Sequence, residues 1–227
     1  MKKWIKKIIV FISAITIAIS QVYGLDAQLP KNIKDAVKTL SNKCLEFDQK
    51  VYKSCYSPKL GRAVYVEYIV DERSSQENIK NRPNFYNDKR IKKTNIEDYK
   101  AHSGVYDKGH LAFHAAFDYS KRAVKETYNL DLNIVPMMQR VNRHQWTYME
   151  RLILKEAKEG KKVHVLDILT ESFFYLNEGE VNIPNKMYKI ITIDDNTTCY
   201  MVHNLDHDKN KEPYTTDCSQ IQNMILN

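Results

Sequence analysis

The chain has 227 residues and a formal charge of +7, and this length suits a single domain with a substantial core. Four of the positive charges are lysines in the first 24 residues, and removing these four from +7 leaves +3 for residues 25–227. A charge this small excludes overall basicity as an argument for a nucleic-acid partner. Because the sequence contains no internal repeat and its 6 glycines and 6 prolines are scattered, we predict one domain over residues 25–227.

Residues 1–24 have the pattern of a signal peptide. An apolar run over residues 8–20 follows a basic start, and Val22-Tyr23-Gly24 forms a cleavage site. The run is too short to span a bilayer comfortably, although an uncleaved N-terminal anchor is the alternative. We therefore expect an exported protein, periplasmic or secreted, without a transmembrane span once the leader is removed.

The first half of the mature chain contains two predicted elements. The apolar spacing of residues 32–45 predicts a helix. Residues 62–70 are rich in β-branched and aromatic side chains, which predicts a strand. Residues 71–100 are polar and irregular, so we expect no regular element there.

The second half alternates helices and strands. A short helix is predicted over residues 119–128 and a longer one over 141–158, where Trp146, Met149, Ile153 and Ala157 share one face. Residues 162–169 and 187–194 are predicted strands. This order indicates an α+β fold with a central, mostly antiparallel sheet and flanking helices.

All four cysteines, Cys44, Cys55, Cys199 and Cys218, lie beyond the leader. An even number in an exported protein favours two disulfides. Three pairings are possible, and the lower entropy cost of closing short loops favours Cys44–Cys55 with Cys199–Cys218. The absence of a Cys-x-x-Cys motif argues against a zinc ribbon or a thioredoxin-type site.

Residues 106–150 concentrate the side chains that phosphodiester hydrolysis needs. His110 can take a proton from water near neutral pH. Asn142 and Glu150 offer an amide and a carboxylate oxygen, which are hard donors of the kind that hydrated Mg²⁺ accepts. Histidine is common, however, and the other six histidines lack a comparable context.

Three blocks in this region resemble those of the DNA/RNA non-specific endonuclease family, which are secreted sugar-non-specific nucleases. The blocks are Asp107-Lys108-Gly109-His110, Asn133-Ile134-Val135-Pro136 and Asn142-x-x-x-Trp146-x-x-x-Glu150. A weaker resemblance extends from Arg82 to Tyr188. The resemblance implies an α+β fold with a ββα-metal finger as its active site.

The resemblance also implies a role for several residues. His110 corresponds to the general base that activates water, and Asn142 to the direct protein ligand of Mg²⁺ or Mn²⁺. For Asn142 the alternative is a helix N-cap, which asparagine favours. Asn133 corresponds to an asparagine that organises the metal-water site, although a structural role is an equal alternative. Arg82 corresponds to an arginine that grips phosphate oxygens.

Glu150 lies eight residues after Asn142, about 12 Å along and about 80° round a straight helix. Joint coordination of one ion by these two side chains is therefore geometrically poor. We expect Glu150 to orient metal-bound water or a nearby cation, and the alternative is an ion pair with a lysine of the same helix.

The sequence departs from the family pattern near the predicted base. Lys108 stands where arginine is usual, and Met137 replaces a glutamine after the proline. The family has the motif Gly-His-x-x-Pro, and after Gly109-His110 the place of its proline is taken by Phe113. Lys108 keeps the positive charge of arginine but not its planar fork, so it is a candidate phosphate contact whose effect on rate is open.

These features predict an exported, metal-dependent endonuclease that cuts DNA and RNA with little base preference and has no evident stable protein partner. One alternative is an HNH-type nuclease, which would need further histidines on the helix, where only His144 is available. Another is an exported nucleic-acid-binding or uptake protein on an inactive nuclease scaffold. His110 and Asn142 argue against it, whereas Lys108 keeps it open.

Overall fold

The computed structural model describes residues 29–76, 78–91, 99, 102, 104–176, 180–205 and 212–226. The predicted leader lies outside these residues. In the part of the chain that is described, no helix is both long and apolar enough to cross a membrane.

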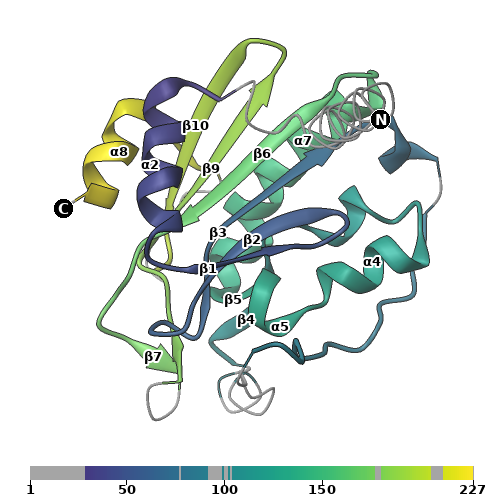
Figure 1. The fold of residues 1–227 in the computed structure, drawn as a ribbon. Helices are drawn as coiled ribbons and strands as arrows, with labels where there is room; N and C mark the ends of the chain where they lie inside the picture. The colour runs from purple at the N-terminus through teal and green to yellow at the C-terminus, as the bar shows by residue number, and fades with distance from the viewer. Residues whose placement is uncertain are drawn as a thin grey trace, which may run out of the picture.

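A seven-stranded sheet forms the centre of the fold, in the order β1-β2-β3-β6-β9-β10-β11 (Figure 1). Every neighbouring pair in it is antiparallel. Its strands are β1 (Leu45–Asp48), β2 (Tyr52–Ser57), β3 (Arg62–Val70), β6 (Val163–Leu169), β9 (Lys186–Ile193), β10 (Asn196–His203) and β11 (Tyr214–Thr216). The predicted α+β fold with a mostly antiparallel sheet is confirmed.

Helices cover both faces of the sheet. Helices α2 (Lys31–Ser41) and α8 (Cys218–Leu226) lie side by side on one face, and α7 (Thr147–Lys158) packs on the other (Figure 1). Strand β3 sends Val66 and Tyr68 to the α7 side and Tyr65 to the α2 side, as the two-residue period of a strand requires. Because both faces are covered, nearly every residue of β3 is buried.

A ββα unit, whose helix is continuous with α7, lies on this second face of the sheet. Strand β4 (Tyr106–His110) pairs antiparallel with β5 (Ile134–Met138). The helix after β5 begins as α6 (Gln139–Val141), passes through a π-turn over Asn142–Trp146 and continues as α7. The segment between the two strands contains η2 (His114–Ala116), α4 (Lys121–Thr127) and α5 (Leu130–Asn133). The remaining elements are η1 (Glu72–Ser75), β7 (Tyr175–Leu176) and β8 (Val181–Asn182).

Gly109 allows the two finger strands to pack closely. A Cβ atom at this position would lie 2.6 Å from the Cβ of Met137 on the paired strand. Real Cβ atoms do not approach this closely, so a larger residue would push β4 away from β5. The glycine before His110 is therefore required by packing, and not by a turn, because it lies within β4 and its φ is not positive.

The structure corrects two predicted boundaries. The first helix ends at Ser41 and not at residue 45, because Leu45 already belongs to β1. The helix predicted over 141–158 begins earlier, at Gln139. The predicted strands 62–70, 162–169 and 187–194 and the short helix over 119–128 are confirmed to within two residues. No prediction was made for β1, β2 or β10.

The two disulfides join the pairs that short-loop closure favoured. Cys44 pairs with Cys55, and Cys199 pairs with Cys218, with Cα atoms 5.6 and 5.4 Å apart. The first bond ties the end of α2 to β2, and the second ties β10 to the start of α8. Both helices on this face of the sheet are thus covalently tied to a strand beneath them.

Candidate active site

His110 is the last residue of β4, and its ring packs against two aromatic side chains that also contact each other. The ring centroids of Phe85 and Tyr128 are 5.7 and 4.7 Å from that of His110. The backbone carbonyl of His110 accepts a hydrogen bond from Trp146 Nε1 at 3.0 Å. Part of the residue remains accessible, yet Nε2 is buried and has no hydrogen-bond partner among the described residues. An unpartnered buried nitrogen is unusual and points to a functional group.

The surroundings keep the His110 ring neutral. Burial, with smaller contributions from His114 and Arg82, lowers the pKa of His110 to about 3. The ring is therefore unprotonated at neutral pH. Arg82 is exposed, and its charge contributes to the lowered pKa of His110, so its guanidinium lies near the ring.

His114 holds Tyr128, the aromatic residue that packs on His110, and the sequence did not suggest this role. Its Nε2 lies 2.7 Å from the carbonyl oxygen of Ile79, which can only accept, so Nε2 carries the hydrogen. In the neutral ring, Nδ1 then accepts from the Tyr128 hydroxyl at 3.0 Å. His114 therefore holds the tyrosine that packs on His110.

Asn142 is held by the strand that ends in His110. Its Nδ2 donates to Asp107 Oδ2 at 2.9 Å. Arg143 grips the same carboxylate with two hydrogen bonds of 2.9 and 2.8 Å, which fixes the position of Asp107. Because the amide nitrogen is turned toward Asp107, the amide oxygen is directed away from it and is available as a ligand.

Helix capping does not explain Asn142. The helix begins at Gln139 with Met138 at its N-cap position, so Asn142 lies inside the helix and the N-cap alternative is wrong. Residues 142–146 form a π-turn, a local widening that is frequent at functional sites.

Asn133 is fully engaged with the backbone. Its Oδ1 accepts from Ala112 N at 2.8 Å, and its Nδ2 donates to the carbonyls of Ala112 and Thr127 at 2.8 and 2.7 Å. These bonds hold the chain two residues beyond His110. Asn133 is therefore placed to organise the backbone around the predicted base.

Lys108 lies two residues before His110, and in a strand that spacing puts both side chains on one side. Lys108 Nζ is 5.5 Å from the ring centroid of Phe85 and 5.9 Å from that of Tyr99. Phe85 therefore contacts both the predicted base and a positive charge.

The pKa of Glu150 is affected by charged groups of the sheet. Burial raises its pKa to about 8; Lys189 opposes this shift, Asp167 adds to it and Arg151 opposes it. The strongest charge acting on Glu150 is thus Lys189 of β9, and not a lysine of the same helix. This lysine is a candidate for the nearby cation expected of Glu150.

The finger thus brings together most of the predicted site. His110, Lys108 and Arg82 gather around Phe85 and Tyr128, and Asn142 is joined to the same strand through Asp107. Glu150 lies with the buried Lys189–Asp167 pair. In the described part of the chain, no group of three or more His, Cys, Asp or Glu side chains could hold a metal ion. A metal site built mainly from protein ligands is therefore not found in these segments.

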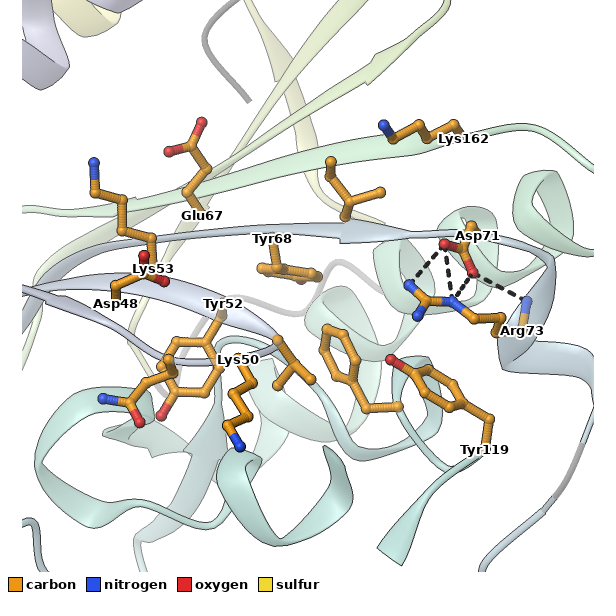
Figure 2. Close-up of a pocket in the computed structure, with 14 residues that line it drawn as sticks. Asp48, Lys50, Tyr52, Lys53, Glu67, Tyr68, Asp71, Arg73, Tyr119 and Lys162 are labelled. Carbon is orange, nitrogen blue, oxygen red and sulfur yellow. Dashed lines mark hydrogen bonds and ion pairs between the residues drawn. The ribbon is translucent and has the colours of Figure 1, made fainter. Parts of the chain in front are cut away.

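A cavity of about 300 Å³ lies elsewhere, beside β2 and β3 (Figure 2). Its described lining includes Tyr52, Tyr119 and Lys162 but none of the predicted site residues. Arg73 in its wall is already paired with Asp71 and lies 4.8 Å from the Tyr119 ring centroid. An enzyme that cuts a long polymer needs an open surface more than an enclosed cavity, so we place the candidate site at the finger.

Comparisons with known proteins identify the family of this chain. A family model described as DNA/RNA non-specific endonuclease matches residues 31–224. The chain belongs to this family. It is therefore a nuclease by membership, with nucleic acids as the substrates that the family implies.

The fold is also found among solved structures. One chain of the crystal structure of the EndoG/EndoGI complex, which was solved to explain how EndoG is inhibited, superposes on this protein with a TM-score of 0.71. The match covers 87% of this chain and 90% of that chain at 18% sequence identity, so it shows a shared fold. A comparison with curated proteins gives no match.

Proposed function

We propose that this protein is an exported, metal-dependent endonuclease that cuts DNA and RNA with little sequence preference, with His110 as the general base. The observation that carries the proposal is the placement of His110. Its ring packs against Phe85 and Tyr128 with Nε2 buried and without a described partner, at the end of a strand that also holds Asn142 through Asp107.

The proposed reaction begins with a proton transfer to His110. His110 takes a proton from water, whose oxygen forms a bond to phosphorus as the bond to the 3′-oxygen breaks, and the leaving oxygen takes a proton from solvent. The products are a 3′-hydroxyl end and a 5′-phosphate end, as the family resemblance implies, and His110 returns its proton to solvent. In this proposal Arg82 and Lys108 stabilise the negative charge that develops on the phosphate oxygens; the effect of Arg82 on the pKa of His110 and the position of Lys108 on the Phe85 ring support these roles.

The residues present fit a hydrated divalent cation. Asn142 Oδ1 is oriented by the bond from Nδ2 to Asp107, and a single amide oxygen with water in the remaining positions suits Mg²⁺ or Mn²⁺. When bound, the cation supplies positive charge close to the phosphate and to the leaving oxygen. The low sequence preference is expected because contacts to phosphate and sugar carry no direct sequence information.

Export is supported by two independent features. The first 24 residues have the composition of a signal peptide. The mature chain carries two disulfides, which persist in oxidising compartments. Both features fit a protein that acts in the periplasm or outside the cell.

A cleavage assay tests the proposal against the inactive-scaffold alternative. We expect residues 25–227 to cut plasmid DNA and single-stranded RNA with Mg²⁺, to stop in EDTA and to recover when Mg²⁺ or Mn²⁺ is added back. Electrophoresis of the products and a gel-shift experiment give the two readouts. Binding without cleavage would favour the inactive scaffold, and full cleavage in EDTA would refute the metal requirement.

Lys108 offers a second test, because its Nζ lies on the Phe85 ring that also packs on His110. Arginine can grip two phosphate oxygens with a planar fork, whereas lysine offers a compact point charge. We expect Lys108→Arg to match or raise kcat/KM, and Lys108→Ala to lower it by about one to two powers of ten. Equal kcat/KM values for the wild type and both variants on one duplex would remove Lys108 from the site.

A further inference from the structure

A buried lysine lies beneath the finger. The side chains of Lys189 on β9 and Asp167 on β6 are both 0% exposed, and Lys189 Nζ lies 2.7 Å from Asp167 Oδ1. Nζ also donates to the Tyr68 hydroxyl at 3.0 Å and is 4.1 Å from the centroid of the Trp146 ring. The ammonium is thus surrounded by a carboxylate, a hydroxyl and an indole face. Glu150, on α7, is a further titratable group whose pKa responds to both members of this pair.

Stability alone is a poor reason for this pair. Removing two charges from water costs several kcal/mol per ion, and apolar residues of similar volume often replace a buried pair without loss. Asp167 Oδ2 has no hydrogen-bond partner among the described residues, so the pair is not even fully satisfied. A buried pair of this kind is better explained if it fixes the positions of the side chains that contact it, here Tyr68 and Trp146.

The two aromatic neighbours of Lys189 both reach the end of β4. Trp146 Nε1 donates to the carbonyl of His110 at 3.0 Å, and the Tyr68 hydroxyl donates to the carbonyl of Leu111 at 3.1 Å. The Tyr68 oxygen accepts from Lys189, and its single hydrogen has two acceptors beside it, the carbonyl of Leu111 and the carboxylate of Asp167, so the buried pair sets the direction of the hydroxyl. Two donors that touch one ammonium therefore hold two successive carbonyls.

The tyrosine remains a donor at every physiological pH. Burial raises the Tyr68 pKa well above its usual value, and the charges of Asp167 and Glu150 raise it further. The hydroxyl therefore stays protonated, and the hydrogen bond to Leu111 does not depend on pH in the working range.

We propose that the Lys189–Asp167 pair is a positioning element for His110: it fixes Tyr68 and Trp146, whose hydrogen bonds hold the peptide units on which the imidazole is mounted. The inference rests on the proposed role of His110 as general base. Its physical basis is that a displacement of about 1 Å at a reacting group can cost about 10²-fold in rate. Free rotation of the peptide unit after His110 would permit such a displacement.

The test removes single hydrogen bonds while keeping an aromatic ring at each position. Tyr68→Phe and Trp146→Phe each delete one donor to a carbonyl, and the double variant Lys189→Met/Asp167→Leu deletes the buried pair without leaving a lone charge. Glu67→Gln is the matched control. It alters another buried pair of the same sheet, in which Glu67 Oε1 lies 2.8 Å from His164 Nε2, on the opposite face from the finger.

Three measurements separate positioning from stability: kcat and KM on one duplex at saturating Mg²⁺, the melting temperature, and the NMR signals of the His110 ring in histidine-labelled protein. We expect a fall in kcat of about 10- to 100-fold for the three network variants, with KM within about twofold. The His110 ring signals should shift in the same variants. Glu67→Gln should lower only the melting temperature.

Two results would overturn the inference: wild-type kcat and unshifted His110 signals in the folded network variants, or an equal fall in kcat for Glu67→Gln. A failure of the proposed function looks different. If His110→Ala cuts at the wild-type rate, His110 is not the base, yet the ring signals still report whether the network positions it.

Discussion

Replacing His110 with alanine is expected to lower cleavage of duplex DNA by about 10²–10⁴-fold, the usual cost of losing a general base. The variant should fold, because the ring makes no described side-chain hydrogen bond at Nε2, while the carbonyl bonded to Trp146 belongs to the backbone. The measurement is kcat/KM on one duplex, with circular dichroism and the melting temperature as controls for folding. Cleavage near the wild-type rate in a folded variant would exclude His110 as the base.

The same residue predicts a pH dependence of stability. Burial lowers the folded-state pKa of His110 to about 3, whereas an unfolded histidine titrates near 6.5. Between these values the unfolded state binds more protons, so the free energy of unfolding falls as the pH is lowered from about 6.5 to about 3. His110→Ala should reduce this fall in the free energy of unfolding, as measured by urea titrations at several pH values. An unchanged fall would mean that other groups cause the acid sensitivity.

Replacing Asn142 with alanine is expected to have the second largest effect, by removing the one proposed protein ligand of the cation. The Mg²⁺ concentration for half-maximal cleavage should rise by more than the about 10- to 100-fold typical of losing a residue that only orients a ligand. A Mg²⁺ titration of the initial rate measures this shift, and calorimetric Mg²⁺ binding checks it without catalysis.

Asp107→Asn is the graded control for Asn142. It keeps the shape of the side chain that accepts from Asn142 Nδ2 but weakens the bond and removes the charge that Arg143 grips. Its Mg²⁺ requirement should lie between those of the wild type and Asn142→Ala. If Asn142→Ala leaves the titration unchanged, Asn142 is not the ligand, and its bond to Asp107 is only structural.

Local patterns were enough for several elements of this fold. Strand β3 and helix α7 were predicted from periods of two and 3.6 residues, which depend only on neighbouring side chains. The helix boundary before Cys44 was missed because Leu45 starts β1, whose pairing with β2 depends on residues further along the chain and not on helix periodicity. The start at Gln139 was missed because the π-turn interrupts the apolar spacing.

The sequence by itself determined the family, the blocks around His110 and Asn142, and the disulfide pairs, because each depends on residues close together in the chain. Only the tertiary structure decided what surrounds them. Phe85 reaches the His110 ring from another segment, and the register of β3, β6 and β9 places Tyr68, Asp167 and Lys189 together beneath Trp146. Strand register is set by the packing of whole faces, which no local pattern encodes, so a lysine in the core could be recognised only in the folded protein.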